Sequence, residues 1–144
     1  DLPFHQSEEL ASLLKERNMD FILMVTPNTT DKRLKAIAEK ASGFLYCVST
    51  LGVTGDSANA GTPLKEYTDR VRAVTSLPLA LGFGVNSPEK ARLAAEAADG
   101  VVVGSALISL LEPCATDRAC LEKKAVPFLR SLQPSLQPGS GLVK

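Results

Sequence analysis

The stretch from residue 79 to residue 108, LALGFGVNSPEKARLAAEAADGVVVGSALI, most constrains the fold because it contains the same short unit twice. Each unit is an apolar run that ends in glycine, and a segment capped by Ser87 separates the two. Apolar runs without alternation are typical of strands buried on both faces of a parallel sheet. The stretch therefore predicts strand, glycine turn, helix, strand, glycine turn and short helix.

The rest of the chain repeats this pattern without any hairpin signal. Strands are predicted at 21–25, 44–48, 79–81 and 101–103, and helices at about 7–17, 29–43, 62–75, 87–97, 106–111 and 116–132. Strands that alternate with helices indicate an α/β fold with a parallel sheet. In the last helix, Pro127 is expected to cause a kink or to mark a late start.

Glycines stand at the ends of the last two strands, where α/β folds place their ligands. Gly82, Gly84 and Gly104 are expected to adopt positive φ and to let backbone amides approach a ligand. Ser105 would open the short helix and add its hydroxyl. Two such ends, followed by a short extra helix, match the phosphate site of a TIM (β/α)8 barrel. Ordinary turn glycines are the alternative reading.

Length limits how much of a barrel the chain can form. It has 144 residues, whereas a complete (β/α)8 barrel needs roughly 250. We therefore expect about the last four βα units, a half barrel with a C-terminal helix, over residues 1–132. Residues 133–144, rich in Pro, Gly, Ser and Gln, are predicted to be a mobile tail without a function of their own.

Charge and cysteine content exclude several classes of protein. Sixteen basic and sixteen acidic residues balance, so no field would attract nucleic acid or anionic lipid. No apolar run is long enough to span a bilayer. Cys47 is expected to be a buried small hydrophobe. Cys114 and Cys120 bring the cysteines to an odd number without metal-like spacing, which favours a reducing compartment.

The connection from Ser49 to Thr62 is too long for a routine turn between a strand and a helix. Long glycine-bearing loops at the active face of a barrel are often lids that close over substrate. A solvated surface loop is the equally weighted alternative.

Several linked motifs give the chain a family resemblance. They are Asp1-Leu2-Pro3, Tyr46, Gly-Val-Thr-Gly at 52–55, Leu-Gly-Phe-Gly-Val at 81–85, Ser-Pro-Glu at 87–89 and Gly-Ser-Ala at 104–106. In this order they resemble the second half of the tryptophan synthase α subunit. His5 departs from the more acidic family pattern.

The resemblance implies a TIM barrel that cleaves indole-3-glycerol phosphate to indole and glyceraldehyde 3-phosphate by a retro-aldol step. It implies that Gly55, Gly84, Gly104 and Ser105 hold the phosphate, with Gly82 and Phe83 shaping the same turn. Tyr46 would lie near the indole ring, with a core tyrosine as the alternative, and Thr54 would be the lid threonine. These eight residues are the predicted substrate-binding set.

The same resemblance implies that the catalytic glutamate and aspartate lie before Asp1, so this chain alone is expected to be inactive. Asp56 is the one carboxylate expected near the mouth of the barrel. No metal or cofactor is expected in this chain, because pyridoxal phosphate belongs to the family's β subunit. Expected partners are the substrate, that β subunit in a heterotetramer, and either the missing N-terminal half or a second copy. The expected location is the cytoplasm, or the plastid stroma in a plant or alga.

Two alternatives to this function stay open at the level of sequence. One is another phosphate-binding barrel, such as an indole-glycerol-phosphate synthase or a sugar-phosphate isomerase, from which the Gly-Val-Thr-Gly loop would distinguish this chain. The other is a non-catalytic half-barrel binding module.

Overall fold

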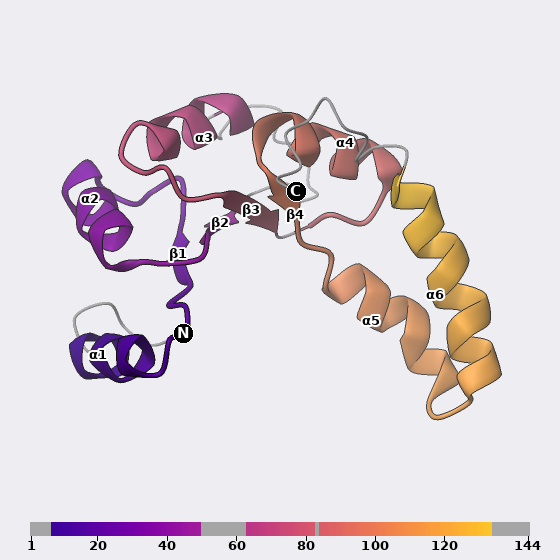
Figure 1. Ribbon diagram of the computed structural model, residues 1–144. Helices are drawn as coiled ribbons and strands as arrows, with labels where there is room; N and C mark the ends of the chain where they lie inside the picture. The colour runs from indigo at the N-terminus through magenta and orange to yellow at the C-terminus, as the bar shows by residue number, and fades with distance from the viewer. Residues whose placement is uncertain (1–6, 50–62, 83, 134–144) are drawn as a thin grey trace.

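The protein is described by a computed structural model that covers residues 7–49, 63–82 and 84–133. Helices and strands alternate along the chain (Figure 1). Their bounds are α1 Glu8–Glu16, β1 Leu23–Val25, α2 Asp31–Lys40, β2 Leu45–Val48, α3 Leu64–Arg72, β3 Leu79–Gly82, α4 Pro88–Ala97, β4 Gly100–Val101, α5 Ser105–Leu111, the 3-10 helix η2 Glu112–Cys114 and α6 Arg118–Leu132. Apart from Gln133, the predicted tail lies outside the described residues.

Within the described residues, the four strands form one sheet in the order β1-β2-β3-β4, and every neighbouring pair is parallel. The predicted α/β class and chain order of strands are therefore confirmed. The ends differ by up to two residues: β1 begins at Leu23, and β4 ends at Val101. One residue beyond the end of β4, the Val102 amide donates a hydrogen bond to the Leu81 carbonyl of β3 at 2.8 Å.

One face of the sheet carries most of the core. Val25, Leu45, Cys47, Leu79 and Leu81 are fully buried and belong to one cluster with residues of α2, α3 and α4. These three helices lie along the same side of the sheet in Figure 1. Alternation along a strand sends the neighbouring side chains to the opposite face.

The opposite face of the sheet is more open than the first. The register aligns one row across the sheet, Met24, Tyr46, Ala80 and Gly100. Met24 is exposed and the other three are half-buried. Among the described residues the sheet is therefore buried on one face and open on the other, as half of a barrel would be.

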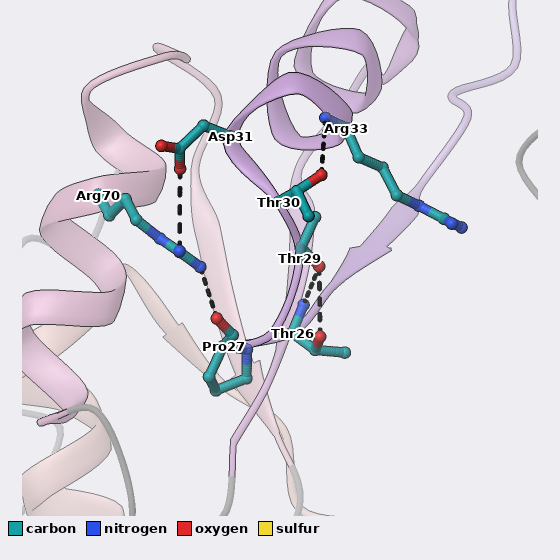
Figure 2. Close-up of polar contacts among 7 residues, drawn as sticks. All are labelled: Thr26, Pro27, Thr29, Thr30, Asp31, Arg33 and Arg70. Atoms are coloured by element: carbon teal, nitrogen blue, oxygen red, sulfur yellow. Dashed lines mark hydrogen bonds and ion pairs between the residues drawn. The ribbon is translucent and has the colours of Figure 1, made fainter.

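Short-range hydrogen bonds start three of the helices, and of these three caps the one at Ser87 was predicted. Thr30 accepts from the Arg33 amide (Figure 2), and Ser87 accepts from the Lys90 amide. Asp117 accepts from the Cys120 amide, so α6 begins beside Asp117 and continues through Pro127. A late start at Pro127 is therefore wrong.

Helix α1 lies at the surface of the described chain. Ser7 occupies the N-cap position without a side-chain capping bond. No residue of α1 is buried, and Leu10 and Leu13, which share one face of the helix, are 38% and 41% exposed. Its contacts with the rest of the described chain include a salt bridge from Glu8 to Lys40 at 3.7 Å.

The cysteines behave differently from one another. Cys47 is buried and reduced, as predicted, and burial raises the pKa of its thiol to about 11 despite a hydrogen bond with Tyr67. Cys114 and Cys120 form a disulfide. The reducing compartment favoured by the sequence would leave these two thiols free. The turn between η2 and α6 brings the two together. No helix in the described ranges has the length and apolar character needed to cross a membrane.

Candidate functional site

The carboxyl ends of β2, β3 and β4 meet at one edge of the sheet because the strands are parallel. Ser49, directly after β2, fixes the spacing of two of these ends. Its amide and its hydroxyl both donate to the Gly82 carbonyl, at 3.0 Å and 2.9 Å. The hydroxyl is buried, so the bond is shielded from water.

Gly82 leaves room for a neighbouring ring. A Cβ on Gly82 would lie 2.7 Å from Tyr46 Cζ and still closer to the Tyr46 hydroxyl. The phenol of Tyr46 therefore crosses the sheet from β2 and lies against the glycine of β3. Gly82 is not among the glycines with positive φ, so its predicted left-handed conformation is wrong and its small size is what the site uses.

Gly84 and Gly104 play different parts. Gly84 has a φ of +78°, which favours glycine and turns the backbone after β3. Gly104 has a φ of −111°, so positive φ was wrongly predicted for it. A Cβ on Gly104 would meet no atom within 4 Å. The backbone at Gly104 therefore borders open space immediately before α5.

These strand ends surround a cavity of about 440 Å³. Its lining residues are Tyr46, Gly84, Val85, Asn86, Val102, Gly104, Ser105, Ala106 and Ser109. The cavity brings together four of the predicted residues, Tyr46, Gly84, Gly104 and Ser105, although Gly104 lies 58 positions after Tyr46 in the chain. Ser105 is the first residue of α5, so its amide lacks an intrahelical partner and is available to a ligand.

The described part of the cavity lining carries no formal charge. None of the nine described lining residues is Lys, Arg, His, Asp or Glu. Across the described ranges, no group of three or more His, Cys, Asp or Glu residues could hold a metal ion. An anion in this cavity would be held by backbone amides, hydroxyls and a side-chain amide.

The remaining predicted residues are not placed in the cavity by the structure. Gly82 lies behind the Tyr46 ring. Thr54, Gly55 and Phe83 lie outside the described residues, as do Asp56 and nearly all of the predicted lid. Sequence reasoning missed Asn86 and Ser109. The one available signal was the four-residue spacing between Ser105 and Ser109, which puts both on one face of a helix.

Two side chains of helix α3 donate hydrogen bonds to backbone carbonyls at, and just after, the carboxyl end of β1. The Tyr67 hydroxyl donates to the Val25 carbonyl at 2.8 Å, and Arg70 Nη2 donates to the Pro27 carbonyl at 2.7 Å. Arg70 also lies 3.8 Å from a carboxylate oxygen of Asp31. Figure 2 shows the guanidinium reaching from α3 to the turn between β1 and α2. These bonds fix a turn at the same edge of the sheet as the cavity.

Asp99 connects the amino ends of β3 and β4, which lie opposite the strand ends that border the cavity. One of its carboxylate oxygens accepts from the Leu79 amide at 2.8 Å and lies 3.0 Å from Arg72 Nη2. Partial burial would raise the pKa of Asp99, but the bonds from Arg72 and Leu79 outweigh it and hold the pKa below its usual value. The carboxylate stabilises the sheet at a distance from the cavity.

Comparison with known proteins gives a consistent family. The family model described as tryptophan synthase alpha chain matches residues 1–135. The tryptophan synthase alpha chain of Petrotoga mobilis is 49% identical over 133 residues, which cover 92% of this chain and 52% of the relative. That of Zymomonas mobilis is 45% identical over 129 residues, covering 87% and 47%. The chain thus spans about half the length of the curated relatives it matches.

Solved structures agree with the sequence comparison. The tryptophan synthase alpha chain from Legionella pneumophila superposes with a TM-score of 0.76 at 31% identity, covering 94% of this chain and 49% of the other. A tryptophan synthase structure from M. tuberculosis in its aminoacrylate-bound form gives 0.75 at 30% identity, covering 95% and 48%. These structures are TIM barrels, and the four parallel strands with their helices correspond to about half of one.

Proposed function

The chain belongs to the tryptophan synthase alpha chain family, and from this premise we propose that it supplies the phosphate-binding half of a lyase. The lyase would cleave indole-3-glycerol phosphate to indole and glyceraldehyde 3-phosphate. The observation that carries the proposal is the uncharged cavity at the strand ends, bordered by Gly84, Gly104 and Ser105. Its volume of about 440 Å³ lies within the range of small-molecule sites.

In this proposal the phosphate lies between the turn after β3 and the start of α5. The backbone amides near Gly84 and Gly104, with the Ser105 hydroxyl, donate to its oxygens. Thr54, Gly55 and Phe83 join the set by family resemblance. Such fixed donors bind a dianion without a cationic side chain because their dipoles are oriented before the ligand arrives.

Tyr46 is proposed to face the indole part of the substrate. Its ring is half-buried on the open face of the sheet, and it lines the same cavity as Ser105. A retro-aldol cleavage also needs a carboxyl group that moves protons at indole C3 and at the side-chain hydroxyl, and a second that acts at the indole N–H. The described residues that line the cavity include no carboxylate, which supports the proposal that this chain alone does not turn over.

The proposal extends to partners and location. The two outer strands, β1 and β4, each have one unpaired edge in the described sheet. An N-terminal half barrel, or a second copy of this chain, would cover them. We further propose pairing with a β subunit that carries pyridoxal phosphate, with no cofactor in this chain, in the cytoplasm or in the plastid stroma.

Ligand titration tests the binding half of the proposal. The chain is titrated by calorimetry with glycerol 3-phosphate and with indole-propanol phosphate. Both should bind, and the indole compound should bind more tightly because it also reaches Tyr46. Equal affinities would instead favour another phosphate-binding barrel or a binding module, and no binding of either would reject the proposal.

Complementation tests the catalytic half. The chain is mixed with a separately produced N-terminal half of a family member, and indole release from indole-3-glycerol phosphate is followed. We expect turnover only in the mixture. Turnover by the 144-residue chain alone would show that the acid–base groups are within it.

A further inference from the structure

Two polar side chains that no sequence motif identifies also line the cavity. Asn86 follows Gly84 in the turn between β3 and α4, and Ser109 lies on α5; both are exposed. Ser105 and Ser109 are four residues apart and therefore share one face of the helix. At 1.5 Å per residue, their Cα atoms are separated by about 6 Å along the helix axis.

These side chains have hydrogen-bonding capacity to spare. Among the described residues, no hydrogen bond engages the side chains of Asn86, Ser105 or Ser109. By contrast, Ser42, Ser49 and Ser87 are each bonded to the backbone, although none of those three lines the cavity. Three unengaged polar side chains therefore border the same cavity.

The absence of charge from the cavity makes additional neutral donors important. A phosphomonoester dianion has three terminal oxygens, each able to accept more than one hydrogen bond. With no Lys or Arg among the described residues that line the cavity, this part of the lining meets the demand with neutral groups. Asn86 can contribute two N–H donors and Ser109 one O–H donor.

We propose that Asn86 and Ser109 are specificity-determining residues of this cavity. They donate to the terminal oxygens of a phosphomonoester, on the side of the phosphate away from Tyr46 and next to Ser105. The inference rests on the proposed phosphate site and adds two residues to it. It predicts that selectivity for a dianion comes from the number of neutral donors.

Separate Asn86→Ala and Ser109→Ala variants test the inference. Affinity for inorganic phosphate and for glycerol 3-phosphate is measured by calorimetry, with the melting curve of each variant as a check on folding. Each variant should bind both ligands about tenfold more weakly, since a hydrogen bond to a charged group is lost. Ser131→Ala, on an exposed part of α6 outside the cavity, is the matched control and should bind normally.

A charged variant gives a result in the opposite direction. Ser109→Lys adds a cation to the neutral cavity, so both ligands should bind more tightly and their affinity should fall with added salt. Unchanged affinity of Ser109→Lys for both ligands would overturn the inference. So would alanine variants that bind glycerol 3-phosphate more weakly but bind inorganic phosphate normally. Normal binding by both alanine variants overturns the inference and leaves the phosphate site standing. Failure of the unmodified chain to bind either ligand overturns both.

Discussion

At the scale of the residue, the neighbouring Tyr46 ring explains why residue 82 is a glycine. Its backbone is ordinary extended strand, and any side chain there would collide with the Tyr46 ring. Tyr46 in turn borders the cavity. The pair therefore connects packing in the sheet with the shape of the proposed substrate site.

Replacing Gly82 with Ala should displace the Tyr46 ring and destabilise the protein by about 1–3 kcal/mol, the usual cost of overpacking. Urea unfolding followed by circular dichroism measures the loss. The double variant with Tyr46→Leu should recover part of it, because the shorter side chain makes room for the new methyl group. Additive losses in the double variant would show that the two side chains do not interfere.

Asp99 gives a prediction that depends on pH. Its pKa is lowered in the folded protein, so its stabilising contribution is complete above the unfolded value near 4 and disappears as pH falls through the folded value. Asp99→Asn keeps an acceptor for the Leu79 amide and removes the charge beside Arg72. At pH 7 it should cost about 1–2 kcal/mol.

Unfolding of both proteins in urea between pH 7 and pH 3 measures this difference. The gap between wild type and Asp99→Asn should narrow below about pH 4 as the carboxylate takes up a proton. Asp69→Asn, at an exposed ion pair with Lys65, serves as a control with little expected effect. A gap that stayed constant with pH would contradict the assigned role.

At the scale of the element, α5 carries the part of the cavity wall that begins at Ser105, and α6 packs against α5. They contact each other, and η2 connects them. Cys114 in η2 and Cys120 in α6 are joined by a disulfide across this turn. Because the bond is covalent, it limits how far the start of α6 can separate from η2. Ala115, between the two cysteines, has an unusual positive φ of 47°.

Loss of this disulfide should lower the free energy of unfolding by about 2 kcal/mol, as expected for a short closed loop. Cys120→Ser, or addition of a reductant to the wild type, tests this by thermal melting. The control is reductant added to Cys120→Ser, because this variant has no disulfide to lose. Cys47→Ser is not a suitable control because that thiol is buried. Under denaturing conditions one thiol should titrate before reduction and three after it, and three before reduction would contradict the pairing.

At the scale of the whole molecule, exposed apolar side chains gather at the two ends of the sheet. Of eight large exposed hydrophobic residues in the described chain, all but Leu93 lie in or next to α1, β1, α5 or α6. Figure 1 shows α1 beyond β1 at one end and α5 with α6 beyond β4 at the other. Helix α1 has three glutamates against one lysine, and α6 has four basic residues against one glutamate. The two ends are therefore complementary in charge as well as apolar.

The isolated chain should accordingly associate with itself at high concentration. Analytical ultracentrifugation over a range of concentrations measures this association. Leu13→Ser on α1 and Leu129→Ser on α6 should each weaken it, because they remove apolar area at the two ends. Leu93→Ser, equally exposed on α4, should not, and a monomer at every concentration would contradict the expectation.

The sequence determined the features that depend on near neighbours in the chain. Strand and helix order follows from the period of the apolar residues, and Thr30, Ser87 and Asp117 cap their helices through bonds that span three residues. In each of these cases the signal and the interaction lie within a few residues of each other. The family motifs named Gly84 and Ser105, which line the cavity; their role in binding phosphate stays a prediction.

Only the tertiary structure decided the rest of the site. It placed Tyr46 across Gly82, brought Asn86 and Ser109 to the same cavity, and left the apolar side of α1 exposed. Gly82 and Gly104 were expected to need positive φ, yet one makes room for a ring and the other borders open space. These features depend on which side chains from distant segments meet in three dimensions. The period and spacing of residues along one chain do not encode that meeting directly.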